Sequence, residues 1–337
     1  MQRAASLLPL PALLAELGIE IDAVLDGTGV SAEHLRPDAF IPYAAFLAVL
    51  DKACSLSGRN DIGMLLGKRQ TLAALGPLGS VLRHAATLGD AIAEFAAFQR
   101  SNSTGGTVYV MRAQKDVILG YGVYDATAVI SPQIYDLVLA VGCNLIAELT
   151  GGAEGPEEIH LSRPQPGDPS PYRRLGGCPV RFGQNQTGLL LRGSTLAFPL
   201  PAADSDLHDQ ALSRLLSGSV GLSRDMAGRV RHLLRPQMLM GQAGMEDVAR
   251  RLDVHPRALR RRLRQDGTTF AAIRDEVRYA AAREFLMLGA LGITDIAVAL
   301  DYATASSFVH AFRRWSGVSP GAWRAGRADR GNPDRPA

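Results

Sequence analysis

Cysteine is scarce in this chain, and long apolar runs are missing. The three cysteines among 337 residues, Cys54, Cys143 and Cys178, are odd in number and far apart. This spacing excludes a disulfide framework and argues for a reducing, cytoplasmic setting.

A membrane-spanning helix needs about 18 consecutive apolar residues. The longest apolar run, residues 137–147, contains Asn144 and favours a buried helix, so we expect no membrane partner.

Motifs for catalysis and for metal binding are also missing. The sequence contains no HExxH, no GxxxxGK(S/T) and no CxxC, and GYGVYD lacks the third glycine of a dinucleotide-binding loop. The seven histidines are scattered without the spacing of metal ligands. We therefore predict no catalytic residue, no metal and no cofactor.

Lysine is absent from the C-terminal third, although that part is strongly basic. Residues 1–220 carry 16 Lys and Arg against 21 Asp and Glu, a net charge of −5. Residues 221–330 carry 19 against 11, a net charge of +8, and all 19 basic residues are arginines. The planar guanidinium donates two parallel hydrogen bonds to phosphate or to guanine. The C-terminal third is therefore expected to bind a polyanion.

The N-terminal two-thirds mixes two kinds of periodicity. Helices are indicated where apolar residues recur every three or four positions: 10–18, 43–58, 87–103 and 131–149. Strands are indicated at 107–114 and 116–125, joined as a hairpin, at 158–164, and twice within 178–191. This mixture predicts an α+β domain.

In the C-terminal third, the spacing of apolar residues predicts only helices, and the sequence pattern occurs twice. Val248-Ala249-x-x-Leu252-Asp253 recurs 48 residues later as Ile296-Ala297-x-x-Leu300-Asp301. Each copy reads as a short helix, a tight turn and a second helix, so we predict two helix-turn-helix motifs, at 244–264 and 292–314. A helix between Thr269 and Gly289 joins them. At ~1.5 Å per residue it spans roughly 27 Å, close to the ~34 Å repeat of B-DNA.

The second helix of each copy has an apolar face and a polar face. In the first copy, Leu259 and Leu263 face the core, Pro256 suits the first turn, and four arginines share the other face: Arg257, Arg260, Arg261 and Arg264. In the second copy, Thr304 is expected to cap the helix. Its apolar side holds Phe308, Phe312 and Trp315, and its polar side holds Ser306, Ser307, His310 and Arg314.

These motifs resemble the tandem helix-turn-helix domain of AraC/XylS-type bacterial transcription regulators. The strongest likeness is ITDIAVALDYATASSFVHAFRRWSGVSPGAWR, residues 293–324. Here Asp301 stands where the family usually has glycine, and His310 where arginine is frequent. The N-terminal part resembles, more loosely, the arabinose-binding-like effector domain of ornithine-utilisation-type members. That likeness lies in residues 41–67, 76–100 and 178–191.

The resemblance implies an α+β N-terminal effector domain followed by an all-α tandem helix-turn-helix domain. The expected limits are 1–215 for the effector and dimerisation domain, 216–221 for a linker, 222–326 for the DNA-binding domain, and 327–337 for a disordered tail. The positions that read bases fall on Arg257, Arg260 and Arg261, and on Ala305, Ser306, Ser307 and His310. Phosphate contacts are expected from Arg264, Thr304, Arg313 and Arg314.

The implied partners are double-stranded DNA, a small-molecule effector, a second copy of the chain and RNA polymerase. Homodimerisation is also suggested by Leu207, Ala211 and Leu215, which share one side of a helix. The effector class stays open between amino-acid-derived and fatty-acid-like compounds, and its pocket is unknown.

Two other functions are weighed against a ligand-responsive regulator. One is an enzyme-like N-terminal domain fused to a DNA-binding module, which lacks a recognisable nucleophile–base cluster. The other is an architectural DNA binder without ligand. It is disfavoured because DNA bending does not require some 200 acidic-leaning residues.

Overall fold

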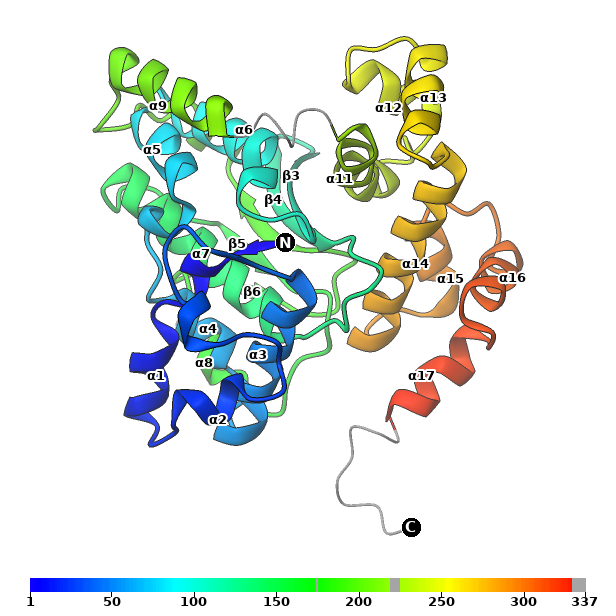
Figure 1. The fold of residues 1–337 in the computed structure, drawn as a ribbon, viewed down its shortest axis with the longest axis horizontal. Helices are drawn as coiled ribbons and strands as arrows, with labels where there is room; N and C mark the ends of the chain where they lie inside the picture. The colour runs from blue at the N-terminus through cyan, green and yellow to red at the C-terminus, as the bar shows by residue number, and fades with distance from the viewer. Residues whose placement is uncertain (174, 219–224, 329–337) are drawn as a thin grey trace.

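The computed structural model describes residues 1–173, 175–218 and 225–328. The expected linker, 216–221, lies outside this part after residue 218, and the expected disordered tail lies outside it after residue 328. Figure 1 shows two domains, an N-terminal domain that contains a sheet and a smaller C-terminal domain that is helical. The predicted fold class, α+β followed by all-α, is confirmed.

A five-stranded sheet forms the centre of the N-terminal domain. Its strand order is β3 (Gly106–Ala113), β4 (Asp116–Val123), β7 (Thr187–Leu191), β5 (Glu158–His160) and β6 (Val180–Arg181). All neighbours are antiparallel except β5 and β6. The predicted hairpin is present, with Ala113 opposite Asp116 and Gln114 at a φ of 58° in the turn. β1 (Gln2–Arg3) and β2 (Phe40–Ile41) form a separate antiparallel pair.

Helices surround this sheet. They are η1 (Ala4–Leu7), α1 (Leu10–Glu16), α2 (Ile21–Leu25), η2 (Ala32–His34), α3 (Tyr43–Ser57), α4 (Ile62–Gly67), η3 (Leu72–Leu75), α5 (Pro77–His84), α6 (Leu88–Phe98), η4 (Gln99–Ser101), α7 (Gln133–Thr150), α8 (Ser170–Arg173), η5 (Gly193–Ala197) and α9 (Ser205–Gly218). By length and composition, α7 could cross a membrane. However, 72% of it is buried inside the protein, as expected for a core helix.

Seven helices form the described part of the C-terminal domain. They are α11 (Met226–Leu239), α12 (Met245–Arg251), α13 (Pro256–Gln265), α14 (Phe270–Leu288), α15 (Ile293–Ala299), α16 (Ala305–Ser316) and α17 (Pro320–Ala328). The pairs α12–α13 and α15–α16 are the two helix-turn-helix copies. The first half of α14, from Phe270 to Val277, packs into the core of the first copy, and Phe285 belongs to the core of the second.

The helix ends follow the residues that the sequence provides. Thr269 caps α14 by accepting from the Ala272 N–H, and Gly289 ends it at a φ of 76°. Pro256 occupies the first turn of α13. Thr304 caps α16 by accepting from the Ser307 N–H at 3.1 Å. These expected starts and stops are confirmed.

The two domains are in contact through α11 and α14. Asp225, the N-cap of α11, accepts a hydrogen bond from Arg100 at 2.6 Å. His232 lies 3.2 Å from the Ala96 carbonyl oxygen and 3.3 Å from the Thr107 hydroxyl.

The far end of α14 is anchored to the N-terminal domain as well. Arg283 donates to the carbonyl oxygens of Ala126 and Ala128. Leu288 joins the hydrophobic core of the N-terminal domain, whereas Tyr124 joins the core of the first helix-turn-helix copy. The two domains therefore share side chains across their interface.

Candidate nucleic-acid interface

The helix α13 presents a continuous arginine face to solvent. Its inner side holds Leu259 and Leu263, both at 0% exposure. The four arginines on its outer side are all exposed, and none forms an ion pair within the described residues: Arg257, Arg260, Arg261 and Arg264. His255, which sequence reasoning missed, caps this helix by accepting from the Arg257 N–H at 3.1 Å. Its position just before Pro256, the first residue of the helix, was the sequence signal that could have identified His255 as the cap.

The helix α16 presents a smaller polar face. Phe308 and Phe312 are fully buried beneath it, and Trp315 and Trp323 pack against the same core. Three of the residues predicted to read bases are exposed, namely Ser306, Ser307 and His310, and Ala305 is half-buried. The Ser307 hydroxyl lies 2.9 Å from the capping hydroxyl of Thr304. A hydroxyl both donates and accepts, so Ser307 retains capacity for a further partner.

The two arginines at the end of α16 differ in their surroundings. Arg313 is exposed. Arg314 forms an ion pair with Asp275 of α14 at 2.7 Å, with the two side chains 64% and 35% exposed. Such an exposed pair contributes only about 0–1 kcal/mol. A phosphate group would compete readily with Asp275 for this guanidinium.

Both helix-turn-helix turns use an aspartate in a left-handed conformation. Asp253 has a φ of 52° and Asp301 a φ of 59°, at equivalent positions of the repeat. A short polar side chain tolerates this region better than most residues other than glycine. In the second copy, Arg278 of α14 donates to the Asp301 carbonyl at 2.7 Å and stacks 4.3 Å from the Tyr302 ring centroid. Arg278 therefore stabilises this turn, a role that the sequence analysis did not predict.

The helix α14 joins the two helix-turn-helix copies, α12–α13 and α15–α16. Since α14 has 19 residues, it is about 28 Å long at ~1.5 Å per residue. Figure 1 shows α11 and α14 toward the effector domain, with α13 and α16 farther from it. The faces that carry the predicted DNA contacts are therefore not covered by the effector domain.

Comparison with known proteins identifies the family. Residues 18–200 match the arabinose-binding domain of AraC transcription regulators, N-terminal part, and residues 248–326 match a helix-turn-helix domain. The chain belongs to the AraC family of transcription regulators. This AraC-family regulator combines an arabinose-binding-like N-terminal domain with a helix-turn-helix DNA-binding domain.

Relatives of this AraC-family regulator span nearly its whole length. It is 30% identical over 295 residues to the HTH-type transcriptional regulator VirS of Mycobacterium tuberculosis, which covers 87% of this chain and 86% of VirS. It is 27% identical over 327 residues to the ornithine utilization regulator of Pseudomonas aeruginosa, with 93% of each chain covered. The crystal structure of the regulator CdpR from Pseudomonas aeruginosa matches with a TM-score of 0.42 and 24% identity, over 85% of this chain and 93% of CdpR.

Proposed function

We propose that this regulator inserts α13 and α16 into two successive major grooves of one DNA duplex and responds to a small molecule. The observation that carries the proposal is the pair of exposed polar helix faces joined by a helix of about 28 Å. Successive major grooves lie ~34 Å apart along B-DNA. The family of the N-terminal domain supports the response to a ligand.

The two recognition helices differ in chemistry, so we propose unequal readout. Arg257, Arg260 and Arg261 can each make a bidentate contact to guanine O6 and N7, worth about 1–3 kcal/mol of discrimination. Ser306, Ser307 and His310 make single hydrogen bonds that tolerate several bases. The half-site under α13 should therefore be G-rich and sharply specified. The half-site under α16 should be looser and depend more on DNA shape.

The test is selection of binding sites from random DNA, followed by titration at several salt concentrations. Arg261→Ala should relax the base preference at one position under α13. Arg314→Ala should weaken binding to all sequences alike and lower the slope of log affinity against log salt by roughly one unit. Equal information content under both helices, or an unchanged base preference in Arg261→Ala, would show that the reading face is misassigned.

The remaining properties are proposals that rest on the relatives. Their names as transcription regulators support a regulator without enzymatic activity, located in the cytoplasm with RNA polymerase as a partner. A homodimer is proposed as well. An assay for turnover with nucleotide and metal panels would separate this function from an enzyme-like N-terminal domain.

A further inference from the structure

The effector domain contains a small cavity between its sheet and α7. The cavity measures about 80 Å³. Strands β3, β4 and β7 form one wall, with Val108, Leu119 and Leu189, and α7 forms the opposite wall. It is smaller than the engineered cavity of about 150 Å³ that accommodates benzene, so it holds a guest of fewer than about six non-hydrogen atoms.

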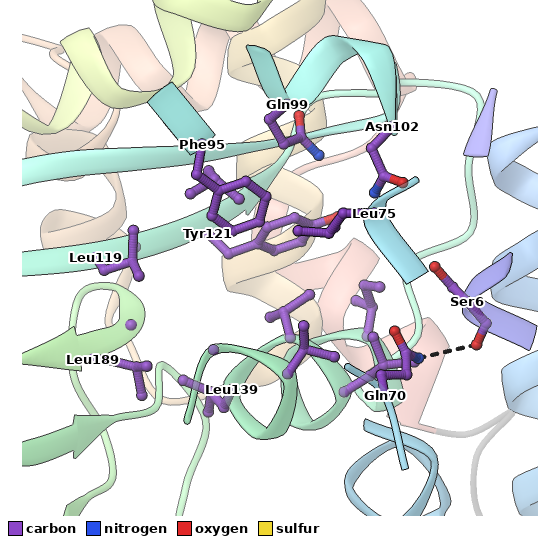
Figure 2. A pocket seen from close by; sticks show the side chains of 18 of the residues that line it. Ser6, Gln70, Leu75, Phe95, Gln99, Asn102, Leu119, Tyr121, Leu139 and Leu189 are labelled. Carbon is purple, nitrogen blue, oxygen red and sulfur yellow. Dashed lines mark hydrogen bonds between the residues drawn. The ribbon is translucent and has the colours of Figure 1, made fainter. Parts of the chain in front are cut away.

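One side of this cavity is mainly polar and the opposite side is apolar. Figure 2 shows Gln99, Asn102, Ser6 and Gln70 spread along one side, with Leu75 among them, and Leu119, Leu139 and Leu189 on the opposite side. The four polar side chains are all at least nine-tenths buried. No Asp, Glu, Lys, Arg or His is among the described residues that line the cavity. A charged group placed here would lose its hydration without gaining an opposite charge, which is strongly unfavourable.

Two side chains on the polar side have unmet hydrogen-bonding capacity. Gln70 donates to the Ser6 carbonyl at 3.0 Å, and Gln2 donates to the Ser6 hydroxyl at 3.1 Å. In contrast, the amide oxygens of Gln99 and Asn102 are buried and have no partner among the described residues. Gln99 is 3% exposed and Asn102 7% exposed. A buried polar atom without a partner is costly, and a ligand that donates a hydrogen bond removes this cost.

We propose that this cavity binds the effector, and that the effector is a small uncharged amphipathic molecule. Its neutral head, a hydroxyl or an amide, exchanges hydrogen bonds with the side-chain amides of Gln99 and Asn102, and its short apolar body lies against Leu119 and Leu189. This inference rests on the proposed ligand response. It excludes ornithine-like amino acids, which carry charge at both ends, and long-chain fatty acids, which exceed the space.

The test compares ligands of equal chain length and different charge on the full-length protein. Propanamide, propanoate and propylammonium are titrated at pH 7, with L-ornithine and decanamide alongside, and melting temperature and heat of binding are measured. Propanamide should raise the melting temperature by mass action and bind at least about tenfold more tightly than either ion, because neither ion finds a counter-charge. A larger shift with an ion, with ornithine or with decanamide would overturn the proposal, as would no shift with any compound.

Variants separate the binding site from general stability. Gln99→Met keeps the side-chain length and removes the unpartnered oxygen, so the variant should fold at least as well as the parent protein and lose most of the propanamide shift. Gln186→Met is the matched control. Gln186 is also buried with an unpartnered amide oxygen, but it does not line the cavity, so its variant should keep the shift. Undiminished propanamide binding by Gln99→Met would contradict the assignment.

A parallel DNA-binding assay distinguishes failure of the proposed ligand from failure of the proposed DNA readout. Specific binding to a selected DNA site without any propanamide effect means that only the ligand assignment fails. Propanamide binding without sequence-specific DNA binding means that the cavity assignment stands and the proposed readout fails.

Discussion

At the scale of single residues, arginine has two separate uses in the C-terminal domain. On α13 it is exposed to solvent, at the proposed DNA contacts, whereas Arg235 of α11 is 1% exposed. Arg235 donates to both carboxylate oxygens of Glu284 at 3.0 and 3.1 Å and lies 5.2 Å from the Phe285 ring centroid. The Arg235 side chain packs closely against strand β4 of the N-terminal domain. A Cβ atom on Gly122 of this strand would lie 2.7 Å from the Arg235 Nε. A basic composition alone cannot separate these two uses.

The buried histidine at the domain interface predicts a loss of stability in acid. Burial lowers the pKa of His232 from 6.5 to about 4, and Arg100 contributes in the same direction. A lowered pKa in the folded state means that the unfolded chain binds the proton more readily. The stabilisation is therefore complete above pH 6.5 and is lost as the pH falls toward 4. Between pH 7 and pH 5 the free energy of unfolding should fall by about 2 kcal/mol from this group.

Denaturant unfolding at several pH values measures this effect. His232→Gln should remove that part of the pH dependence, since glutamine does not titrate. His34→Gln, at an exposed histidine, is the control and should leave it in place. An identical pH dependence in His232→Gln and the parent protein would refute the role of His232.

At the scale of elements, the caps of α14 and α16 allow stability and DNA binding to be separated. Thr269 and Thr304 each accept a hydrogen bond from a backbone N–H of their helix. Aspartate caps a helix about as well as threonine, but its charge repels phosphate. We expect Thr304→Asp to keep the melting temperature and to weaken DNA binding at least about tenfold, and Thr269→Asp to keep both.

Thermal unfolding and DNA titration on the same samples decide this prediction. Thr304→Ala adds a third comparison, because losing the cap should cost about 1 kcal/mol of stability. Full DNA affinity in Thr304→Asp would remove Thr304 from the proposed phosphate contacts.

Elements with strong periodicity were predictable from the sequence. The hairpin β3–β4, the helix α7 and the helices of the repeat lie where the pattern indicates. Short elements were missed, for example α4 and α5, because six to eight residues offer few periodic positions. The candidate DNA face was predictable for the same reason, since its arginines follow the helical period. The effector cavity was not predictable, because Gln99, Asn102 and Leu189 come together only through the tertiary fold.

At the scale of the whole molecule, the helix that suggested a dimer is partly used within its own domain. Of the three residues on its predicted face, Ala211 and Leu215 are buried, and only Leu207 is largely exposed. Leu216 of α9 is also 50% exposed. Leu216 lies nine positions after Leu207 and therefore on the opposite side of the helix, so homodimerisation through the predicted face of α9 rests on Leu207.

Light scattering of the full chain tests this dimer. At about 20 µM, an assembly with a micromolar dissociation constant is largely formed, so we expect twice the mass of one chain. Leu207→Glu should shift the mass toward one chain, whereas Leu216→Glu, on the opposite side of α9, should leave it unchanged. Leu56→Glu is the matched control, at a leucine of α3 that is 49% exposed. A single-chain mass for the parent protein would contradict the prediction.

A line of contacts joins the cavity to the DNA-binding domain. Tyr121 lines the cavity, and its ring centroid lies 6.2 Å from that of Tyr135. Burial raises the pKa of Tyr135 well above its usual value, and the nearby carboxylate of Glu284 adds to this effect. Glu284 is held by Arg235, so the path from the cavity ends on α11 and α14.

The helix α14 has a consequence for how the molecule unfolds. Phe270 and Val277 complete the first helix-turn-helix core, Phe285 completes the second, and Leu288 enters the effector-domain core. Unfolding of any turn of α14 therefore disrupts at least one of these three hydrophobic cores. Calorimetry should therefore register both helix-turn-helix motifs in one cooperative transition, and hydrogen exchange of α14 amides should be among the slowest in the C-terminal domain.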